Sequence, residues 1–367
     1  MRNLLLCLVL VLVFKSCLSE DWCYQSQMSC DQPCKGPAAW NEVNSVCGGN
    51  RQSPINIVTK KTKKESSLTA FKFTGYDKIF TSMLKNNGRT VSLDIPLGAT
   101  VSGGNLLHTY NAIQLHFHWG NNGSPGSEHT LDGEQYPMEL HILHLKDTYI
   151  AVEDALNDTT GQAILGFFFE TEVTRTQLWQ LFMQCERLRS QEHHEVSYSV
   201  NTFHPLHRPI ESCSVSGNEM TRFLSSSSES DSENKEYSAF IAALAQVQDA
   251  EGQAELAISL NSLILSERML GAYYRYEGSE TTPGCSESVI WTMFEQPIPL
   301  SRDQLAAFST LKFNGGKPMV DTFRPVQPRK GRVVYRSHSG AAIPAMMFSF
   351  FLVMLRVFLA LCLCNFY

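Results

Sequence analysis

Short apolar stretches along this 367-residue chain predict β-strands rather than long helices. They are rich in β-branched and aromatic side chains and are bounded by Gly, Asn and Pro, as strands of a sheet are. The predicted strands are residues 67–76, 82–84, 89–95, 112–119, 138–145, 163–169 and 289–294. The chain is long for one domain, but β-rich folds reach this length undivided, so we expect a single mainly β domain.

Polar residues occupy one face of two of these predicted strands. Successive strand side chains point to opposite faces, so Gln114, His116 and His118 share a face. Glu139 and His141 share a face of the next strand for the same reason. Two neighbouring strands can therefore aim three imidazoles at one point.

Three neutral histidines with an open fourth position are the ligand set of a catalytic zinc, whereas a structural zinc usually has four protein ligands. Gln114 and Glu139 each stand two residues before a histidine, and are placed to accept the second ring N–H of His116 and His141. A lone His-x-His pair is more often solvated and metal-free. The third histidine and its flanking glutamate are what favour Zn²⁺ here.

The N-terminus has the pattern of a secretory signal peptide. Arg2 precedes an apolar run over residues 4–14, which is too short to span a bilayer and is followed by small residues up to Ser19. We expect cleavage after Ser19, so that residues 1–19 are removed. A membrane anchor at this end is the alternative, disfavoured because Lys15 closely follows the run.

The C-terminus ends in an apolar tail over residues 343–367, interrupted only by Arg356. Small residues before such a tail are typical of a glycosylphosphatidylinositol signal, in which the tail is removed. We expect Ser339 to carry the lipid anchor, with residues 339–367 as the signal and residues 20–338 as the mature domain. A retained transmembrane helix is the alternative, but Arg356 is costly there and no basic residues close the chain.

The cysteines and the glycosylation sequons fit a secreted protein, and the charge gives no sign of a nucleic-acid partner. Four of the 11 cysteines lie in the two terminal segments, which leaves an odd number whose pairing the spacing does not decide. The sequons at Asn122 and Asn157 lie in polar, turn-rich stretches and predict glycosylation. The net charge is −6 and basic residues are not clustered on any motif, so nothing indicates a nucleic-acid partner.

Several short motifs resemble those of the α-carbonic anhydrases and stand in that family's order. Besides the histidine strands, they are Arg51-Gln-Ser-Pro-Ile-Asn-Ile57, Gly126-Ser-Glu-His-Thr130, Thr281-Thr-Pro283, Val289-Ile-Trp291 and Phe323-Arg-Pro-Val-Gln-Pro328. The resemblance covers most of the chain and is greatest to the extracellular, membrane-anchored carbonic anhydrase IV type. It implies a mainly β (α+β) fold, with a large twisted, mostly antiparallel central sheet, short peripheral helices, and zinc at the base of a conical cleft.

The resemblance also implies a reaction, the reversible hydration of carbon dioxide to bicarbonate and a proton at the outer cell surface, with sulfonamides as inhibitors. Zinc on His116, His118 and His141 is then expected to lower the pKa of its water from roughly 16 to about 7. At neutral pH this water supplies hydroxide. By the same resemblance, Thr281 accepts a hydrogen bond from the hydroxide and donates its own hydrogen bond to Glu128. The pocket for carbon dioxide is expected to be lined by Leu143, Ile164, Val289, Trp291 and Thr282.

The same resemblance implies two disulfides. Cys23 is expected to pair with Cys34, and Cys47 with Cys285, which ties the N-terminal segment to the loop beside Thr281. The partners of Cys30, Cys185 and Cys213 stay open.

Three positions depart from the family pattern. Arg89 stands where fast members have a proton-shuttle histidine, and a guanidinium stays protonated and cannot relay protons at neutral pH. Glu280 stands where the family has a pocket-wall leucine, and we expect its carboxylate to turn outward into solvent because an unpaired buried charge is costly. The alternative is an inward carboxylate, which should seek a partner or take up a proton. Gly284 replaces a proline and is expected only to loosen its loop.

Residues 171–232 have no counterpart in that family pattern. This insert contains several histidines and a serine-rich run, 225–232. No strand or helix period organises the histidines, so we expect a surface loop or an error of the gene model rather than a second metal site.

A catalytically weak or silent binding module, anchored outside the cell and recognising a protein, is the alternative function. Such relatives typically lose a zinc histidine, whereas this chain keeps all three together with Glu128 and Thr281. A purely structural zinc domain is disfavoured by the open fourth position. The sequence therefore favours an enzyme.

Overall fold

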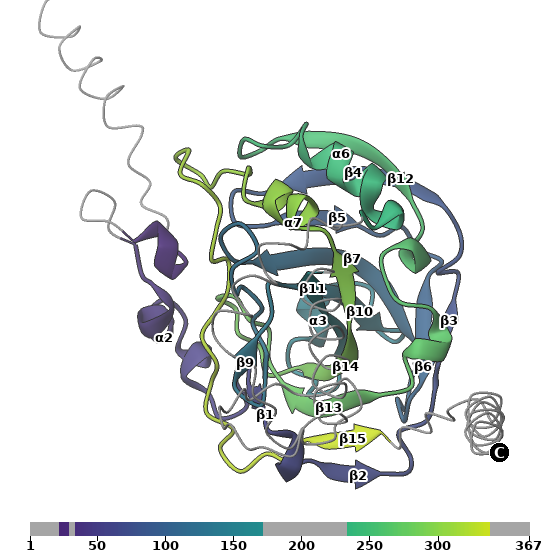
Figure 1. Cartoon of the computed structure of the whole chain (residues 1–367). Coiled ribbons are helices and arrows are strands. Elements are labelled where there is room, and N and C mark those ends of the chain that lie inside the picture. Colours follow the sequence, from purple (N-terminus) through teal and green to yellow (C-terminus); the bar gives the residue numbers. More distant parts are fainter. Residues whose placement is uncertain (1–21, 29–33, 172–232, 338–367) are drawn as a thin grey trace, which may run out of the picture.

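One twisted sheet organises the part of the chain that the computed structural model describes, residues 22–28, 34–171 and 233–337 (Figure 1). The strands follow the order β12-β4-β5-β7-β10-β11-β14-β13-β15-β2, and β3 pairs with β6, which pairs with β7. Neighbours are antiparallel except β11 with β14 and β15 with β2. The bounds are β2 Lys63–Glu65, β3 Phe71–Thr74, β4 Phe80–Asn86, β5 Val91–Asp94, β6 Thr100–Gly103, β7 Tyr110–Trp119, β10 Met138–Lys146, β11 Gln162–Thr171, β12 Gln253–Ile258, β13 Tyr273–Gly278, β14 Val289–Leu300 and β15 Tyr335–Ser337.

The described helices are short and lie around this sheet (Figure 1). The α-helices are α2 Trp40–Val43, α3 Val152–Ala155, α6 Ser238–Leu244 and α7 Arg302–Phe308, and a small sheet contains β1 Asn56–Ile57, β8 Thr130–Leu131 and β9 Glu134–Gln135. Helix α7 begins at a capping box in which Ser301 accepts from the backbone N–H of Gln304. It then buries Leu305 and Phe308 against the core.

Both faces of the central strands are buried, which explains their nearly continuous apolar sequences. Leu165 and Phe167 of β11 belong to a large core with Phe117 of β7. Ile164 points to the opposite face of β11 and packs in a second core with Trp291. The histidines lie on the side of this second core, since the His141 ring lies 4.7 Å from that of Trp291.

The predicted mainly β fold, with a mostly antiparallel sheet and short helices, is confirmed. The predicted strand 67–76 was too long, because only Phe71–Thr74 pairs with β6. The sequence analysis missed β2, β6, β12, β13 and β15. β2 and β15 have only three residues each, and β12 carries alanines and glutamates, which have low strand preference.

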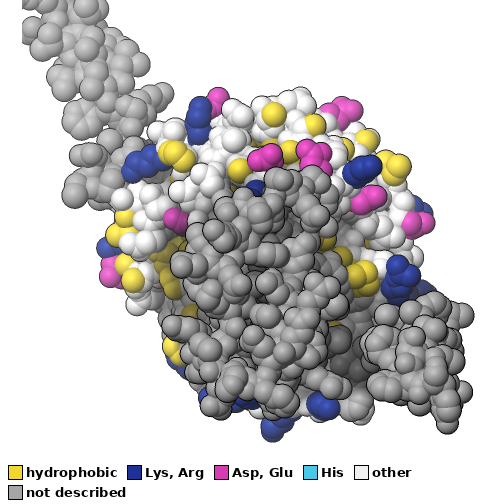
Figure 2. Space-filling model, in the orientation of Figure 1, with side chains coloured by type: hydrophobic (Ala, Val, Ile, Leu, Met, Phe, Trp, Pro, Cys, Tyr) yellow, Lys and Arg dark blue, Asp and Glu magenta, His cyan; other side chains and the backbone are white. Residues whose placement is uncertain are grey.

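Several sequence predictions lie outside the described residues: the signal peptide 1–19, the insert beyond Thr171, and the anchor signal from Ser339. Within the described part, no helix has the length and apolar character needed to cross a membrane. Figure 2 shows acidic and basic side chains of the described residues interspersed around the visible face.

Candidate active site

Strands β7 and β10 bring the three histidines together. The antiparallel register places His116 opposite His141, and His118 opposite Glu139. Directly opposite residues project from the same face of a sheet, so all three rings converge. Their centroids lie 5.1 Å (His116 and His118), 5.1 Å (His116 and His141) and 4.7 Å (His118 and His141) apart.

Each ring is oriented by an acceptor on its outer nitrogen. His116 Nδ1 lies 3.2 Å from Gln114 Oε1, and His141 Nε2 lies 2.5 Å from Glu139 Oε1, the two partners that the alternation predicts. His118 Nδ1 lies 2.6 Å from the backbone carbonyl of Thr322. The sequence analysis missed this third acceptor, because every residue has a carbonyl and no pattern indicates this one.

The inner nitrogens are left facing one another. They are His116 Nε2, His118 Nε2 and His141 Nδ1, and the three residues offer ligand atoms within 4.8 Å of one another. His118 is 1 % exposed, and its Nε2 has no hydrogen-bond partner among the described residues. A buried, unpartnered nitrogen beside two other imidazoles fits a zinc ion that accepts three nitrogen ligands.

The histidines are neutral at physiological pH. Burial lowers the pKa of all three, and the neighbouring imidazoles lower those of His116 and His118 further, that of His118 to about 3. A metal ligand must be the neutral imidazole, so this environment supports ligation over protonation.

Glu139 is the centre of a buried network behind the zinc ligands. Burial alone raises its carboxyl pKa, but His129 and His141 hold that pKa well below the ordinary range. Besides the contact with His141, the carboxylate accepts hydrogen bonds from the backbone N–H groups of Glu128 (3.0 Å) and His129 (2.8 Å). It also contacts His129 Nδ1 at 2.7 Å. His129 Nε2 lies 2.6 Å from the Tyr276 hydroxyl, which lies 2.9 Å from Ser53 Oγ.

The sequence analysis assigned no role to His129, Tyr276 or Ser53. His129 stood in the motif 126–130 and Ser53 in the motif 51–57, and these motifs were the available signals. His129, Glu139 and His141 also come within metal-ligand distance of one another. Both nitrogens of His129 already have partners, so we assign the metal to His116, His118 and His141 instead.

Glu128 and Thr281 lie together beside His118. Glu128 Oε1 accepts the backbone N–H of Arg324 at 2.8 Å, and Oε2 lies 3.4 Å from His118 Nε2. Burial and the charge of Glu139 raise the pKa of Glu128, whereas the Thr281 hydroxyl and Arg324 lower it. Because Thr281 affects this pKa, the two residues that the resemblance pairs lie near each other, and Thr281 is itself buried.

Four predicted pocket residues also lie together. Ile164, Val289 and Trp291 are buried in one cluster, and Leu143 packs against it. The register explains this, since Ile164 pairs with Leu143 on one side and with Trp291 on the other. Thr282, the fifth predicted residue, is half-buried, and its carbonyl accepts the backbone N–H of Cys285 at 2.8 Å.

Glu280 does not turn into solvent as expected. It is half-buried, and its Oε1 accepts a hydrogen bond from Gln162 Nε2 at 3.1 Å. Gln162, at the start of β11, is fully buried and also donates to Ser288 Oγ at 2.9 Å. Burial raises the pKa of Glu280, and the Gln162 amide opposes this. The carboxylate thus avoids an unpaired burial by finding a partner far away in the sequence.

Arg89 lies over the ring of Trp22, with its guanidinium carbon 4.0 Å from the ring centroid. Such stacking is a cation–π contact that holds the side chain in place. Arg89 also lies close enough to Tyr24 to lower the pKa of that phenol, which burial and Glu128 raise. Arg89 is therefore held against the N-terminal segment.

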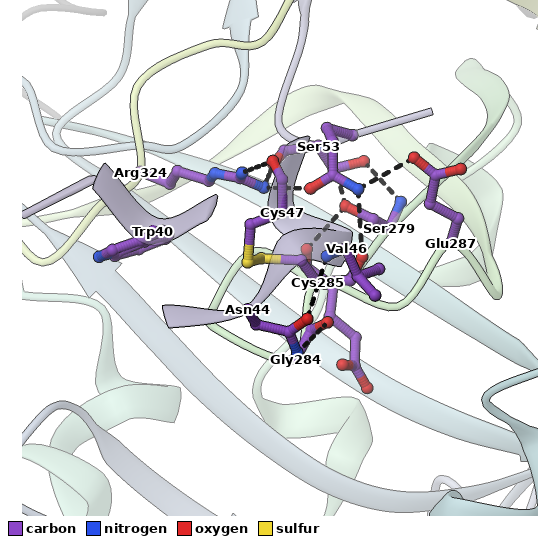
Figure 3. Close-up of a disulfide and its surroundings, with 12 residues drawn as sticks. Trp40, Asn44, Val46, Cys47, Ser53, Ser279, Gly284, Cys285, Glu287 and Arg324 are labelled. Carbon is purple, nitrogen blue, oxygen red and sulfur yellow. Dashed lines mark hydrogen bonds between the residues drawn. A yellow bond between two sulfur atoms is a disulfide. The ribbon is translucent and has the colours of Figure 1, made fainter. Parts of the chain in front are cut away.

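Two disulfides join Cys23 to Cys34 and Cys47 to Cys285, the pairing that the resemblance implies. Figure 3 shows the second bridge, with Arg324 donating to the Cys47 carbonyl at 3.0 Å and Asn44 donating to the Gly284 carbonyl at 3.3 Å. Gly284 has φ +137°, which a proline cannot adopt, so Gly284 gives this loop a different backbone path rather than mere looseness. The sites Asn122 and Asn157 are both exposed, and Cys30, Cys185 and Cys213 lie outside the described residues.

Comparison with known proteins gives one consistent result. The family model for eukaryotic-type carbonic anhydrase matches residues 35–211 and 217–338. The chain is 32 % identical to carbonic anhydrase 4 of Rattus norvegicus over 94 % of this chain and 93 % of that protein. It is 33 % identical to carbonic anhydrase 4 of Oryctolagus cuniculus over 88 % and 86 %, and 31 % identical to carbonic anhydrase 15 of Mus musculus over 87 % and 84 %.

Proposed function

The chain belongs to the eukaryotic-type carbonic anhydrases, and from that premise we propose that it hydrates carbon dioxide reversibly to bicarbonate with a zinc ion on His116, His118 and His141. The observation that carries the zinc assignment is the orientation of the rings. Each outer nitrogen has an oxygen acceptor, and the inner nitrogens share one space. When bound there, zinc acts as a Lewis acid that lets water supply the nucleophile at neutral pH, its known role in this family.

The protein's part in the reaction is orientation. Glu139, ionised and fully hydrogen-bonded, holds His141 in the tautomer that leaves Nδ1 free for the metal. The Thr281 hydroxyl lowers the pKa of Glu128, so it is placed to donate to that carboxylate and to keep its own oxygen as an acceptor. The Thr281 oxygen can accept a hydrogen bond only from a nucleophile that carries a proton. This contact would orient a lone pair of the nucleophile toward the carbon of carbon dioxide. Leu143, Ile164, Val289 and Trp291 supply an apolar wall for uncharged carbon dioxide.

The location we propose is the outer cell surface. Residues 1–19 direct secretion, Ser339 carries a lipid anchor, and Asn122 and Asn157 are glycosylated. The two disulfides and the exposed sequons support an extracellular domain.

The test is zinc content and carbon dioxide hydration of the secreted domain. We expect about one zinc per chain, sulfonamide-sensitive activity, and loss of both zinc and activity in His118→Ala. His108→Ala is the matched control, because His108 is exposed and outside the triad, and should keep both. Zinc retained in full by His118→Ala contradicts the ligand assignment, and zinc-loaded protein without activity supports the silent binding module instead.

A further inference from the structure

A cavity of about 620 Å³ lies on the face of the sheet opposite the histidines. Its lining includes Arg275 of β13, Ile290 of β14 and Leu107 of the loop before β7. The side chain of Tyr276 contacts His129 on the zinc side, so its neighbour Arg275 points to the other face. The cavity thus lies on the Arg275 side, although Tyr276, whose hydroxyl reaches His129, also contributes to its lining.

Arg275 is a buried charge without an acidic partner. It is 8 % exposed, and its Nε donates to Thr292 Oγ1 at 3.1 Å. Its Nη2 is buried and makes no hydrogen bond within the described ranges, and no described carboxylate forms an ion pair with it. The guanidinium carbon lies 5.6 Å from the ring centroid of Phe71 and 5.8 Å from that of Tyr273. These cation–π contacts offset only part of the cost of burying the charge. Burial lowers the pKa of Arg275 to about 10, so the guanidinium stays charged at neutral pH.

The acids that line the cavity are already engaged elsewhere. Glu277 pairs with Arg51 at 3.3 Å, and Glu65 accepts from the backbone and hydroxyl of Ser67. Arg332, a second lining cation, donates only to backbone carbonyls, among them that of Gln52 at 2.7 Å. Neither carboxylate forms an ion pair with Arg275, so this guanidinium is the cation of the lining that an anion from outside can pair.

The rest of the lining suits an organic anion better than a hydrated inorganic ion. Leu68, Ile290 and Val333 supply apolar surface, and Leu107, 88 % exposed, stands at the solvent side. A carboxylate can pair with the charge of the guanidinium, and an apolar body can cover the aliphatic wall.

We propose that this cavity binds a small organic monocarboxylate, with its carboxylate on Arg275 and its apolar part against Ile290 and Leu107. The bound anion supplies the partner that the buried guanidinium lacks, which is why charge and burial are compatible at this position. Arg275, which holds the carboxylate, is not part of the zinc site, and we expect carbon dioxide hydration not to require the bound anion.

Isothermal titration of the zinc-loaded secreted domain with benzoate, and with neutral benzamide, tests this proposal. Benzoate should bind measurably tighter than benzamide, and Arg275→Met should weaken benzoate about tenfold or more while leaving hydration activity unchanged. Arg336→Met is the matched control, because Arg336 pairs with Glu295 and does not line the cavity. His118→Ala should keep the Arg275-dependent binding, which separates it from any carboxylate held by zinc.

A second variant covers the case in which Arg275→Met does not fold. Leu107→Glu places a carboxylate at the exposed side of the cavity and should weaken benzoate by repulsion without disturbing the core. Equal benzoate affinity in wild type and Arg275→Met overturns the proposal. If that variant does not fold, unchanged affinity in Leu107→Glu together with loss of binding in His118→Ala overturns it.

Discussion

At the scale of single residues, we expect Arg89 to limit the rate of the proposed hydration. Its guanidinium is held on Trp22, and a guanidinium group has no free lone pair with which to accept the proton that each hydration releases. We therefore expect proton export to depend on buffer molecules that reach the site.

Replacing Arg89 with histidine should therefore raise the maximal rate. An imidazole near its ordinary pKa can relay protons, so we expect kcat to rise by roughly tenfold in weak buffer, with kcat/KM nearly unchanged. Stopped-flow hydration at several buffer concentrations measures this. Arg89→Lys is the control and should keep the wild-type buffer dependence, while a histidine variant equally dependent on buffer contradicts the idea.

Glu280 and Gln162 form a polar pair where the family pattern has a leucine at position 280. Gln162→Leu leaves the half-buried carboxylate without its amide donor, and should lower the free energy of unfolding by about 1–3 kcal/mol. Adding Glu280→Leu should recover most of the lost stability, because replacing both partners by apolar groups removes the polar group that has no hydrogen-bond partner. Denaturant unfolding of the two single variants and the double variant measures the coupling. Purely additive losses would show that the pair does not act as a unit.

At the scale of elements, the connection from β10 to β11 is held by a partly buried ion pair. Lys146, at the end of β10, contacts Asp158 and Thr160 of the following turn. Burial raises the pKa of Asp158, but Lys146 and Thr160 outweigh it and lower that pKa to about 2. A carboxyl with a depressed folded-state pKa stabilises the fold above its unfolded pKa of about 3.9, and that stabilisation is lost as pH falls toward 2.

Lys146→Met should thus reduce stability by about 1 kcal/mol at neutral pH. The difference from wild type should shrink between about pH 4 and pH 2, as Asp158 takes up its proton in both proteins. Thermal unfolding as a function of pH measures it. Lys312→Met is the matched control, because its pair with Asp249 is exposed and should contribute little. A difference that is constant across this range would exclude the linkage.

For the whole molecule, the proposal of a lipid anchor has a direct test. Cells that express the full chain should release active enzyme when treated with phosphatidylinositol-specific phospholipase, since the only proposed link to the membrane is at Ser339. A chain truncated after Ser337 should be secreted without treatment, which serves as the reference. Resistance to the phospholipase, with residues 343–367 still attached, supports a retained transmembrane helix.

The sequence alone determined what depends on near neighbours in the chain. Strand alternation predicted the shared face of His116 and His118 and their partner Gln114, and the same alternation paired Glu139 with His141. These predictions succeed because residues two apart in a strand stay on one face in any sheet. The mainly β fold followed from the same local patterns and from motifs that resemble a known family.

The tertiary structure decided what depends on segments far apart in the chain. The Thr322 carbonyl that orients His118 lies 204 residues away from it, and Gln162 lies 118 residues from Glu280. Arg275 became a candidate ligand site only when its strand was placed beside Thr292 and acidic partners were found to be missing among the described residues. Such partners are chosen by packing and by the cost of burying polar groups, and no local pattern encodes either.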